Sequence, residues 1–272
     1  MTAITAILTC FNRKEKTVEC LKSLVNGNPT INFTFIVVDD RSNDGTVDAI
    51  KNLGFNTIIV NGNGNLFWSG GMRKGIDYYL KNYKTDYVMF VNDDVSFFDD
   101  AIHKILKQSI ESDKVIVGAT CNEKNEFTYG ALKLIKPRKN DLYYHVKPED
   151  EDILCDTFNA NCVLLKDEVL RKVGNFDPIY RHALADLDYG FMISRNGYKI
   201  ASSRNYIGIC YTNSSRGGWR DTSLSRIERL KQKESIKGAP FREWYHFMNK
   251  NFGSLLAIRY SITPYLRILI GK

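Results

Sequence analysis

The sequence lacks the features of a disulfide scaffold, a zinc protein or a membrane-spanning protein. Its six cysteines include no Cys-x-x-Cys pair and mostly stand in apolar runs, which predicts small buried residues in a reducing compartment. No apolar run approaches the ~20 residues of a membrane-spanning helix. The apolar start, Thr2–Phe11, lacks the basic residues and the cleavage pattern of a secretory signal. We therefore expect a cytoplasmic protein.

The first four-fifths of the chain also lack an excess of charge. Residues 1–215 hold 26 Lys or Arg and 27 Asp or Glu, whereas residues 216–272 hold 12 and 4. The net charge of +7 therefore comes from the C-terminal fifth, which predicts a surface that meets an anionic partner. The chain has no internal repeat, and 272 residues suit one large domain with an appendage.

Buried strands and helices alternate through the first half of the chain. Short apolar runs predict strands at 3–9, 33–38, 56–60, 87–91 and 114–119. Apolar residues at helical spacing predict helices at 16–25, 46–53, 72–81 and 101–109. Strands that are apolar throughout and separated by helices are typical of an α/β protein with a mostly parallel sheet, flanked by helices on both faces.

The second half has a different pattern. Two longer strands are predicted at 127–135 and 156–165, around a polar loop, Lys136–Asp152, with short helices at 167–173 and 187–195. A basic helix, an aromatic helix and an apolar end follow at 223–233, 241–251 and 255–270. We expect a catalytic domain over residues 1–215 and a helical C-terminal appendage over residues 216–272.

Polar, small or acidic residues follow four successive predicted strands. These segments are Thr9–Arg13, Asp39–Thr46, Asn61–Asn65 and Asn92–Asp94. Ligands of an open parallel sheet bind outside the carboxyl ends of its strands, near a switch in strand order. The four segments therefore predict one shared site. The element Gly62-x-Gly64 does not match the dinucleotide-binding fingerprint Gly-x-Gly-x-x-Gly. Phe67 replaces the third glycine, and the element follows the third predicted strand, whereas the fingerprint follows the first.

The acidic pair Asp93–Asp94 has two interpretations. It could cap the helix predicted from Ala101, but Asp99 and Asp100 are nearer to that helix. Mg²⁺ and Mn²⁺ prefer hard oxygen ligands and take only one or two from protein when phosphate supplies others. We favour a Mn²⁺ or Mg²⁺ site that neutralises a leaving diphosphate, as in an enzyme that acts on a nucleotide-sugar.

Five motifs together resemble the inverting glycosyltransferases of family 2, which have the GT-A fold. The resemblance covers about residues 3–200, and the motifs are Ala3–Arg13, Val37–Thr46, Ser69–Ile76, Asn92–Asp94 and Val163–Pro178. Within the family the chain is most similar to rhamnosyltransferase-like members of bacterial cell-surface polysaccharide synthesis, capsule included. The resemblance implies transfer from a UDP- or dTDP-sugar to a hydroxyl of a glycan or lipid-linked saccharide, with Mn²⁺ or Mg²⁺ as cofactor.

The resemblance also assigns roles. Asp186 aligns with the catalytic base, Asp94 with the metal ligand, and Asp40 with the residue that binds the nucleobase. Asp93 or Asn92 would face the ribose. The donor-binding residues implied in this way are Thr9, Phe11, Asn12, Arg13, Asp40, Asn65, Trp68, Gly71, Arg73, Asn92 and Asp93.

Several positions depart from the family pattern or have a second interpretation. Ala185 replaces the usual Glu, and Arg73 replaces an Asn, where it binds phosphate or is a solvated helix charge. The metal-binding His after the last strand is missing, since Ile209–Asn213 stands there. His182 is the histidine nearest to the base, either structural or functional. Asp186 could cap its helix as well as act as the base. Asp188 either supports the base from behind or contacts the acceptor.

Two regions rich in aromatic residues also stay open. Phe67 and Trp68 lie in a predicted loop, Asn65–Gly71, as a donor-side wall or as core residues. The basic and aromatic C-terminal region fits an interfacial helix on the inner face of the cytoplasmic membrane, but also a helix packed on the catalytic domain or a homodimer contact.

Two other functions explain fewer residues. A nucleotidyltransferase that makes nucleotide-sugars would need a glycine-rich, lysine-bearing loop after the first strand, and Thr9–Arg13 lacks one. A non-catalytic basic module that binds membrane or nucleic acid leaves the acidic strand ends unexplained, because carboxylates repel phosphate. We therefore expect no nucleic-acid partner.

Overall fold

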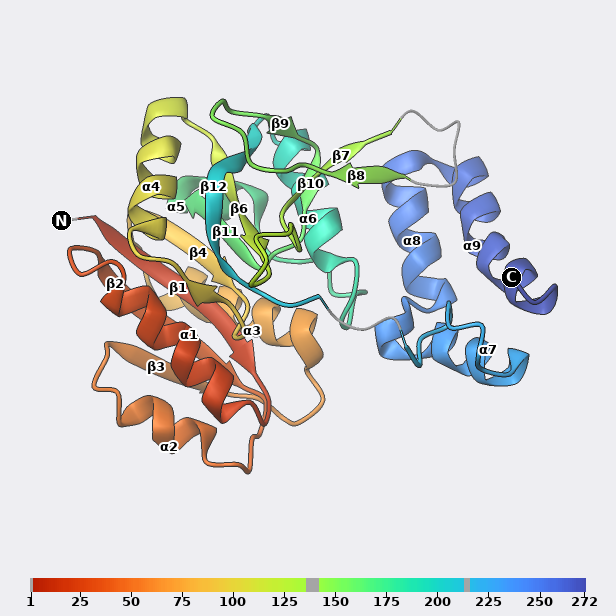
Figure 1. The fold of residues 1–272 in the computed structure, drawn as a ribbon, viewed down its shortest axis with the longest axis horizontal. Helices are drawn as coiled ribbons and strands as arrows, with labels where there is room; N and C mark the ends of the chain where they lie inside the picture. The colour runs from red at the N-terminus through yellow and green to blue at the C-terminus, as the bar shows by residue number, and fades with distance from the viewer. Residues whose placement is uncertain (1, 136–141, 213–215) are drawn as a thin grey trace.

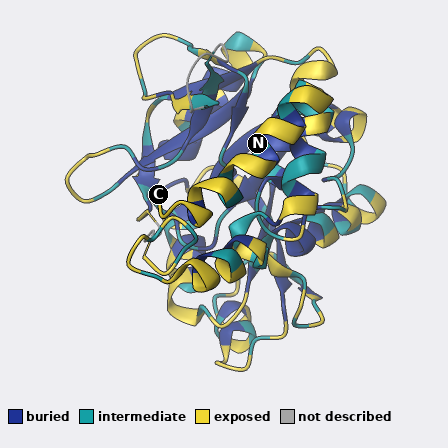
Figure 2. Cartoon of the chain, turned by 90° about the vertical axis from the view of Figure 1, so that its right-hand side faces the viewer, coloured by how far each residue is buried: buried dark blue, intermediate teal, exposed yellow. Residues whose placement is uncertain are grey.

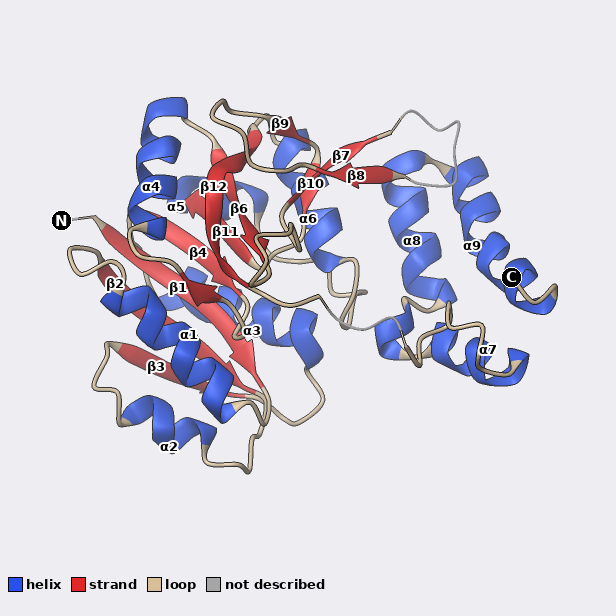
Figure 3. Cartoon of the chain, in the orientation of Figure 1, coloured by secondary structure: helices blue, strands red, loops and turns tan. Residues whose placement is uncertain are grey.

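The computed structural model describes residues 2–135, 142–212 and 216–272. Within them, a nine-stranded sheet forms the centre of the molecule (Figure 1). Its strands are β1 (Ala3–Cys10), β2 (Asn32–Asp39), β3 (Thr57–Asn61), β4 (Tyr87–Val91), β5 (Ser96–Phe97), β6 (Val115–Cys121), β9 (Leu154–Cys155), β11 (Cys162–Lys166) and β12 (Ile200–Ile209). A small antiparallel sheet contains β7 (Ala131–Leu134), β8 (Tyr143–His145) and β10 (Thr157–Phe158), on the side towards α8 (Figure 3).

Helices cover both faces of the large sheet. The helices of the described chain are α1 (Lys14–Asn26), α2 (Thr46–Lys51), α3 (Phe67–Asn82), α4 (Ala101–Ser112), α5 (Asp167–Val173), α6 (Ala185–Arg195), α7 (Arg226–Glu234), α8 (Phe241–Phe252) and α9 (Ser254–Leu269), with a short 3₁₀ turn, η1 (Ile236–Gly238). Of these, α7 and α9 lie beyond α8, away from the sheet (Figure 1). The strands are buried, whereas the outer sides of the helices carry most of the exposed residues (Figure 2).

The strand order is β3-β2-β1-β4-β11-β6-β12-β5, with β9 paired to β12. β1 pairs in parallel with both β2 and β4, β2 with β3, and β6 with β12, while β11 runs antiparallel between β4 and β6. The expected α/β fold with a mostly parallel sheet is confirmed. Because β2 and β3 lie on one side of β1 and β4 on the other, the strand order switches between β1 and β4.

Alternation along the strands explains the two helical layers. Ile7 of β1 packs in the core with α3, α5, α6 and α8, whereas Ala6 and Leu8 pack in the core with α1, α2 and α4. All three side chains have no exposed surface. A strand buried on both faces gains stability from every side chain, which is why these strands are continuous apolar runs in the sequence.

Three expectations about the second half and the aromatic loop are wrong. The strand predicted at 156–165 is two strands, β10 and β11, because β10 pairs with β7 and β11 with the large sheet. The strand predicted at 127–135 is the shorter β7. The predicted loop Asn65–Gly71 is mostly helix, since α3 begins at Phe67. The loop Lys136–Asp152 includes β8, and its residues 136–141 lie outside the described part of the chain.

The C-terminal helices pack on the catalytic half. Phe247 and Met248 of α8 and Ala257 of α9 are buried in the core that also contains α3 and α6. A domain boundary at residue 215 stays a prediction. Within the described residues, no helix combines the length and the apolar character that crossing a membrane requires.

Close packing of α3 on the sheet predicts the effect of two glycine substitutions. A Cβ on Gly75 would lie 2.6 Å from Ile7 Cγ2 and 3.1 Å from Val38 Cγ2, whereas one on Gly70 would come no closer than 3.4 Å to Leu66 Cβ. Gly75→Ala should lower the free energy of unfolding by about 1–3 kcal/mol, as overpacked core residues do. Gly70→Ala, in the same helix, should be neutral or stabilising by up to ~1 kcal/mol. Urea denaturation measures both, and equal effects would contradict this account of the α3 contact.

Candidate active site

The switch between β1 and β4 brings the predicted site residues together. β1 and β4 run in parallel, so the segments that follow Cys10 and Val91 leave the same edge of the sheet. β11 is antiparallel to β4 and pairs Cys162 with Val91, so the segment Asn159–Asn161 reaches that edge as well. Asn92 N–H donates to the Asn161 carbonyl at 3.0 Å, which joins two segments far apart in sequence.

Arg13 bridges the acidic pair. Its Nη1 lies 3.0 Å from Asp93 Oδ1 and its Nη2 lies 2.7 Å from Asp94 Oδ2. Asp93 is buried and also accepts from Thr17 Oγ1 at 3.2 Å, whereas the Asp94 side chain is 22% exposed. Burial raises the pKa of Asp93 to about 6, against the attraction of Arg13. The structure thus divides the pair, with Asp93 held inward and Asp94 open to a ligand.

Trp68 supports this centre from α3. Its Nε1–H donates to Asn92 Oδ1 at 2.7 Å, and its ring stacks on Phe176 at 5.7 Å between centroids. Trp68 is therefore a packed residue that holds Asn92, while its neighbour Phe67 is 37% exposed. A contact of Asn92 or Asp93 with a ribose stays a prediction, because both side chains already have partners.

Asp40 stabilises the start of α3. Its carboxylate accepts hydrogen bonds from the backbone amides of Gly64 and Leu66, both at 2.8 Å, and of Phe67 at 3.3 Å. These are donors that the first turn of a helix leaves unpaired, and a negative charge there also interacts favourably with the helix dipole. A nucleobase that binds Asp40 would compete with these amides, so the predicted contact would occur at some cost to the start of α3.

The other predicted donor residues have varied surroundings. Thr9 Oγ1 donates to the Val38 carbonyl at 3.0 Å. A Cβ on Gly71 would lie 2.2 Å from Thr9 Oγ1, so the absence of a side chain at Gly71 lets α3 pack closely on β1. Asn12 joins two loops, because its Oδ1 accepts from the Asn43 amide at 2.8 Å. Phe11 is 51% exposed and Asn65 is exposed, so both lie free for a ligand.

Asp186 begins α6 and lies partly exposed beside the segment Asn159–Asn161. Its Oδ1 accepts from the Leu187 amide at 2.9 Å, and its Oδ2 accepts from the Ala160 amide at 3.4 Å. Burial raises the pKa of Asp186 above its ordinary value, although these hydrogen bonds oppose the shift. A carboxylate with a raised pKa that is held by backbone amides suits a general base.

Asp188 interacts with α8, and a contact with an acceptor stays a prediction. It is buried and accepts from Lys250 Nζ at 2.6 Å and from Asn251 Nδ2 at 2.9 Å, both on α8. Lys250 Nζ also lies 2.8 Å from Asp177 Oδ2. Two carboxylates from the catalytic half thus share one cation of the C-terminal region. Asp188 thus fixes α6, which carries Asp186, against α8.

Arg73 and Ser69 of α3 hold the loop that precedes the base. Arg73 Nη1 donates to the Tyr180 carbonyl at 3.3 Å, and Ser69 Oγ donates to the same oxygen at 2.9 Å. Arg73 is therefore no freely solvated charge. In the same loop, His182 has a buried Nδ1 without a hydrogen-bond partner among the described residues, and burial and Lys237 lower its pKa.

The described residues fit a divalent metal only in part. Asp94 offers one open carboxylate, and no group of three His, Cys, Asp or Glu in the described ranges could hold an ion. Cys210, from the segment where relatives carry a His, lies 3.7 Å from Asp94 Oδ1. Burial raises the pKa of the Cys210 thiol to about 12, so it is a poor ligand for Mn²⁺ or Mg²⁺. Asn213, from the same predicted segment, lies outside the described residues.

Some contributors to the site were not identified from the sequence. Thr17 donates a hydrogen bond to Asp93, and Asn159 forms one with Asp186. Asn161 Nδ2 lies 3.3 Å from the Cys210 sulfur. Asn159 and Asn161 lie where a continuous strand was expected, so two asparagines within an apolar run were the available signal.

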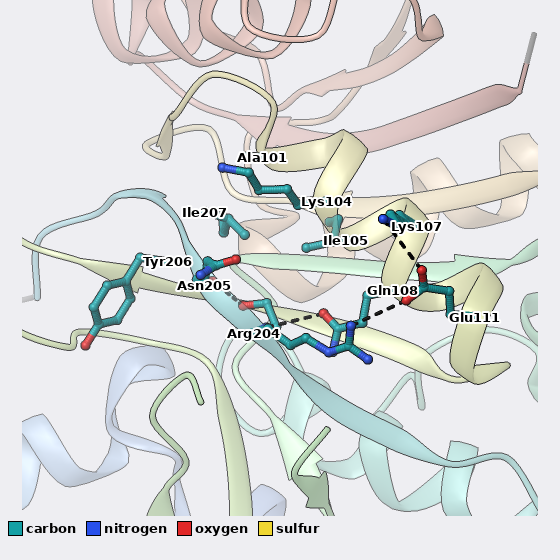
Figure 4. A pocket seen from close by; sticks show the side chains of 11 residues that line it. Ala101, Lys104, Ile105, Lys107, Gln108, Glu111, Arg204, Asn205, Tyr206 and Ile207 are labelled. Atoms are coloured by element: carbon teal, nitrogen blue, oxygen red, sulfur yellow. Dashed lines mark hydrogen bonds and ion pairs between the residues drawn. The ribbon is translucent and has the colours of Figure 1, made fainter. Parts of the chain in front are cut away.

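One pocket lies apart from all these residues. It has a volume of about 220 Å³ and is formed between α4 and β12 (Figure 4). Glu111 there lies 3.8 Å from Lys107 and 3.4 Å from Arg204. None of the predicted site residues lines it.

Comparisons with known proteins give a family and a fold. Residues 5–174 match the family described as glycosyl transferase family 2. Among solved structures, the mannosyltransferase PcManGT from Pyrobaculum calidifontis, in complex with GDP-Man and Mn²⁺, has a TM-score of 0.59 at 13% identity, over 98% of this chain and 73% of that chain. S. aureus TarS 1-349 with UDP-GlcNAc has a TM-score of 0.58 at 13% identity, over 98% and 72%.

TarS 1-349 with UDP has a TM-score of 0.56 at 17% identity, over 92% of this chain and 72% of that chain. Identities this low establish the fold alone, and the expected GT-A fold is confirmed. Among curated proteins no match was found.

The shared cation Lys250 yields a prediction about stability. Lys250→Met leaves the buried Asp188 with Asn251 and with Arg195, whose Nη2 is 3.8 Å away. The free energy of unfolding should fall by about 2–3 kcal/mol, less than for a fully buried pair because the Lys250 side chain is 27% exposed.

Lys231→Met, at an exposed lysine of α7, is the matched control and should change stability little. Adding Asp188→Asn to Lys250→Met should restore part of the loss, since it removes the unpaired charge. Denaturation midpoints of the three variants measure this, and an unchanged midpoint for Lys250→Met would show that the network adds nothing to stability.

Proposed function

The chain belongs to glycosyl transferase family 2, and on that premise we propose that it moves a sugar from a UDP- or dTDP-sugar to a hydroxyl of a glycan or lipid-linked acceptor, with inversion. One observation carries the proposal. The segment Asn159–Asn161 joins Asp186 to the Arg13–Asp94 centre at the strand switch, through Ala160 on one side and the Asn92–Asn161 bond on the other. A base and a diphosphate site then lie at the same edge of the sheet.

Asp186 acts as the general base in this proposal. As the acceptor oxygen bonds to the anomeric carbon, the bond from that carbon to the diphosphate oxygen breaks, and Asp186 takes the hydroxyl proton. The amides of Ala160 and Leu187 hold its carboxylate, so little reorganisation accompanies the proton transfer. General-base assistance of this kind contributes ~10²–10⁴ in rate.

Arg13 and Asp94 serve the leaving diphosphate. Arg13 holds the Asp94 carboxylate in place, and its charge offsets part of the negative charge of the acidic pair. Mn²⁺ or Mg²⁺, when bound at Asp94, would supply the positive charge that stabilises the diphosphate as it leaves. The complex of PcManGT with GDP-Man and Mn²⁺ supports this assignment by likeness of fold.

The proposal also covers the donor, the biosynthetic pathway and the cellular compartment. The bound molecules named for similar structures, GDP-Man, UDP-GlcNAc and UDP, support a nucleoside diphosphate donor, and the exposed Phe11 offers a ring for its base. A rhamnosyltransferase-like role in polysaccharide or capsule synthesis rests on the sequence resemblance. Six free, buried cysteines suit the cytoplasm as the place of action.

Asp186→Asn should keep donor binding and lose transfer. We expect kcat to fall by ~10²–10⁴ with an unchanged Kd for UDP, because only the base is removed. In the wild-type protein, the base works as the carboxylate, so activity should be present above its pKa and fall as the pH drops through it, at a pH above the ordinary value of 3.8. Asp48→Asn, at an exposed aspartate of α2, is the control. An active Asp186→Asn protein would place the base elsewhere.

Removal of metal should weaken donor binding. Calorimetric titration with UDP should give a Kd at least about tenfold higher in a chelator than in Mn²⁺, a difference of about 1.4 kcal/mol. Asp94→Asn should remove this metal dependence, whereas Asp100→Asn, at an exposed aspartate before α4, should retain it. If the chelator leaves the Kd unchanged, Arg13 carries the diphosphate charge without a metal.

A further inference from the structure

The last helix, α9, has an aliphatic side that nothing in the described chain covers. Its large aliphatic residues recur every three or four positions, which places them along one side of the helix. They are Leu255 (84% exposed), Ile258 (49%), Ile262 (43%), Leu266 (54%) and Leu269 (54%), called here the α9 stripe. The opposite side is fully buried through Ala257, Ser261 and Ile268. α9 is thus anchored on one side and apolar on the other.

This stripe differs from ordinary exposed aliphatic residues. A single exposed residue such as Ile110 of α4, which is 61% exposed, is common on any protein surface. Five in a continuous row form an apolar surface of the kind that marks an interaction site. α9 lies at the edge of the molecule farthest from the sheet, beyond α8, where it is accessible (Figure 1).

A basic pocket adjoins the α9 stripe. Arg259, Thr263 and Arg267, on the flank of α9 next to the stripe, line a cavity of about 390 Å³. The cavity also holds three further cations and several aromatic rings, namely Arg220, Lys233, Lys237, Trp219, Trp244, Tyr143 and Tyr260. No Asp or Glu is among its described lining residues. The pocket therefore suits an anion with an apolar body attached.

Lys233 is a built part of this pocket. It is 2% exposed, and its Nζ donates to the carbonyl oxygens of Gly238, at 3.1 Å, and of Ala239. Burial lowers the pKa of Lys233 to about 8. Its hydrogen-bond partners are neutral carbonyls, while Glu234 and Glu243 attract its charge without a direct ion pair in the described residues, so an anion in the pocket would be attracted to it.

The acidic residues of the C-terminal region are engaged elsewhere. Glu228 caps α7 through Ser225, and Glu234 accepts from the Tyr265 hydroxyl. Glu243 pairs with Arg181 at 2.7 Å, and Asp221 accepts from its own turn. Within the described residues, the pocket arginines on α9 have no ion pair. Twelve basic and four acidic residues from 216 onward give this region an excess of positive charge, part of which lines the pocket.

We propose that the C-terminal region docks on a membrane surface rich in anionic phospholipids, with the α9 stripe in the lipid and a headgroup phosphate in the basic pocket. Such a surface presents apolar chains and negative charge side by side, as the stripe and the pocket do. A second copy of the chain fits less well, because a two-fold interface would bring two positive faces together. Docking is independent of the proposed transfer chemistry.

Vesicle flotation with the full chain tests the proposal. The protein should float with vesicles of equal parts phosphatidylcholine and phosphatidylglycerol but not with phosphatidylcholine alone, and high salt should release it. Ile258→Ser combined with Leu266→Ser should lower the bound fraction about tenfold, through lost apolar contact with lipid. Arg259→Glu combined with Arg267→Glu should do the same. Ile110→Ser, at an equally exposed site on α4, should bind as the wild type does.

UDP binding by each variant separates this test from the proposed transfer. A variant that binds UDP normally is folded, so its loss of flotation supports docking through α9. Failure of the wild-type protein to float with anionic vesicles overturns the proposal. So does a stripe variant that floats normally but changes the sedimentation mass from dimer to monomer, since the stripe would then be a contact between copies. If the protein bound inorganic diphosphate in the basic pocket but did not float with anionic vesicles, that result would also overturn the docking proposal.

Discussion

The site depends on one guanidinium group that lies between two carboxylates. Arg13 follows β1, Asp93 and Asp94 follow β4, and only the parallel pairing of these two strands brings the three together. Asp93 is almost fully buried, so without Arg13 and Thr17 its charge would be costly. The same constraint leaves Asp94 partly open. Chain segments more than 75 residues apart thus form one charged centre, because the fold must balance the buried charge of Asp93.

Much of the fold's first half could be predicted because its signals are local. β1, β2 and β4 are buried on both faces, so each is a plain apolar run. The second half carries weaker signals, since the split of 157–166 into β10 and β11 depends on different partner strands. Gly70 and Gly71 suggested a loop, but they lie in the first turns of α3, and Gly71 allows the close approach of this helix to Thr9 of β1. Distant pairs such as Trp68 with Asn92 left no trace in the sequence.

The residue types at the site were easier to predict than their partners. Asp94 and Arg13 do reach one edge of the sheet, as the strand ends indicated, and Asp186, which only the family resemblance singled out, lies beside the same edge. What each side chain binds could not be known, because it depends on contacts across the fold. Asp40 interacts with the start of α3 and Asp188 with α8, so both aspartates stabilise the fold in the absence of a ligand. Helix capping and ligand binding are compatible in such residues but compete for the same oxygens.

The network around Lys250 also bears on how such chains diversify. Asp177 and Asp188 lie in the catalytic half, and the cation that balances both lies on α8. An exchange of C-terminal regions between relatives would change the surface of the protein. It would also leave the buried Asp188 carboxylate without its cation, unless the new helix had a basic residue at the position of Lys250. Substitutions at these three positions should therefore be inherited together. The charge balance of α6 thus limits which C-terminal regions this catalytic half can acquire by recombination.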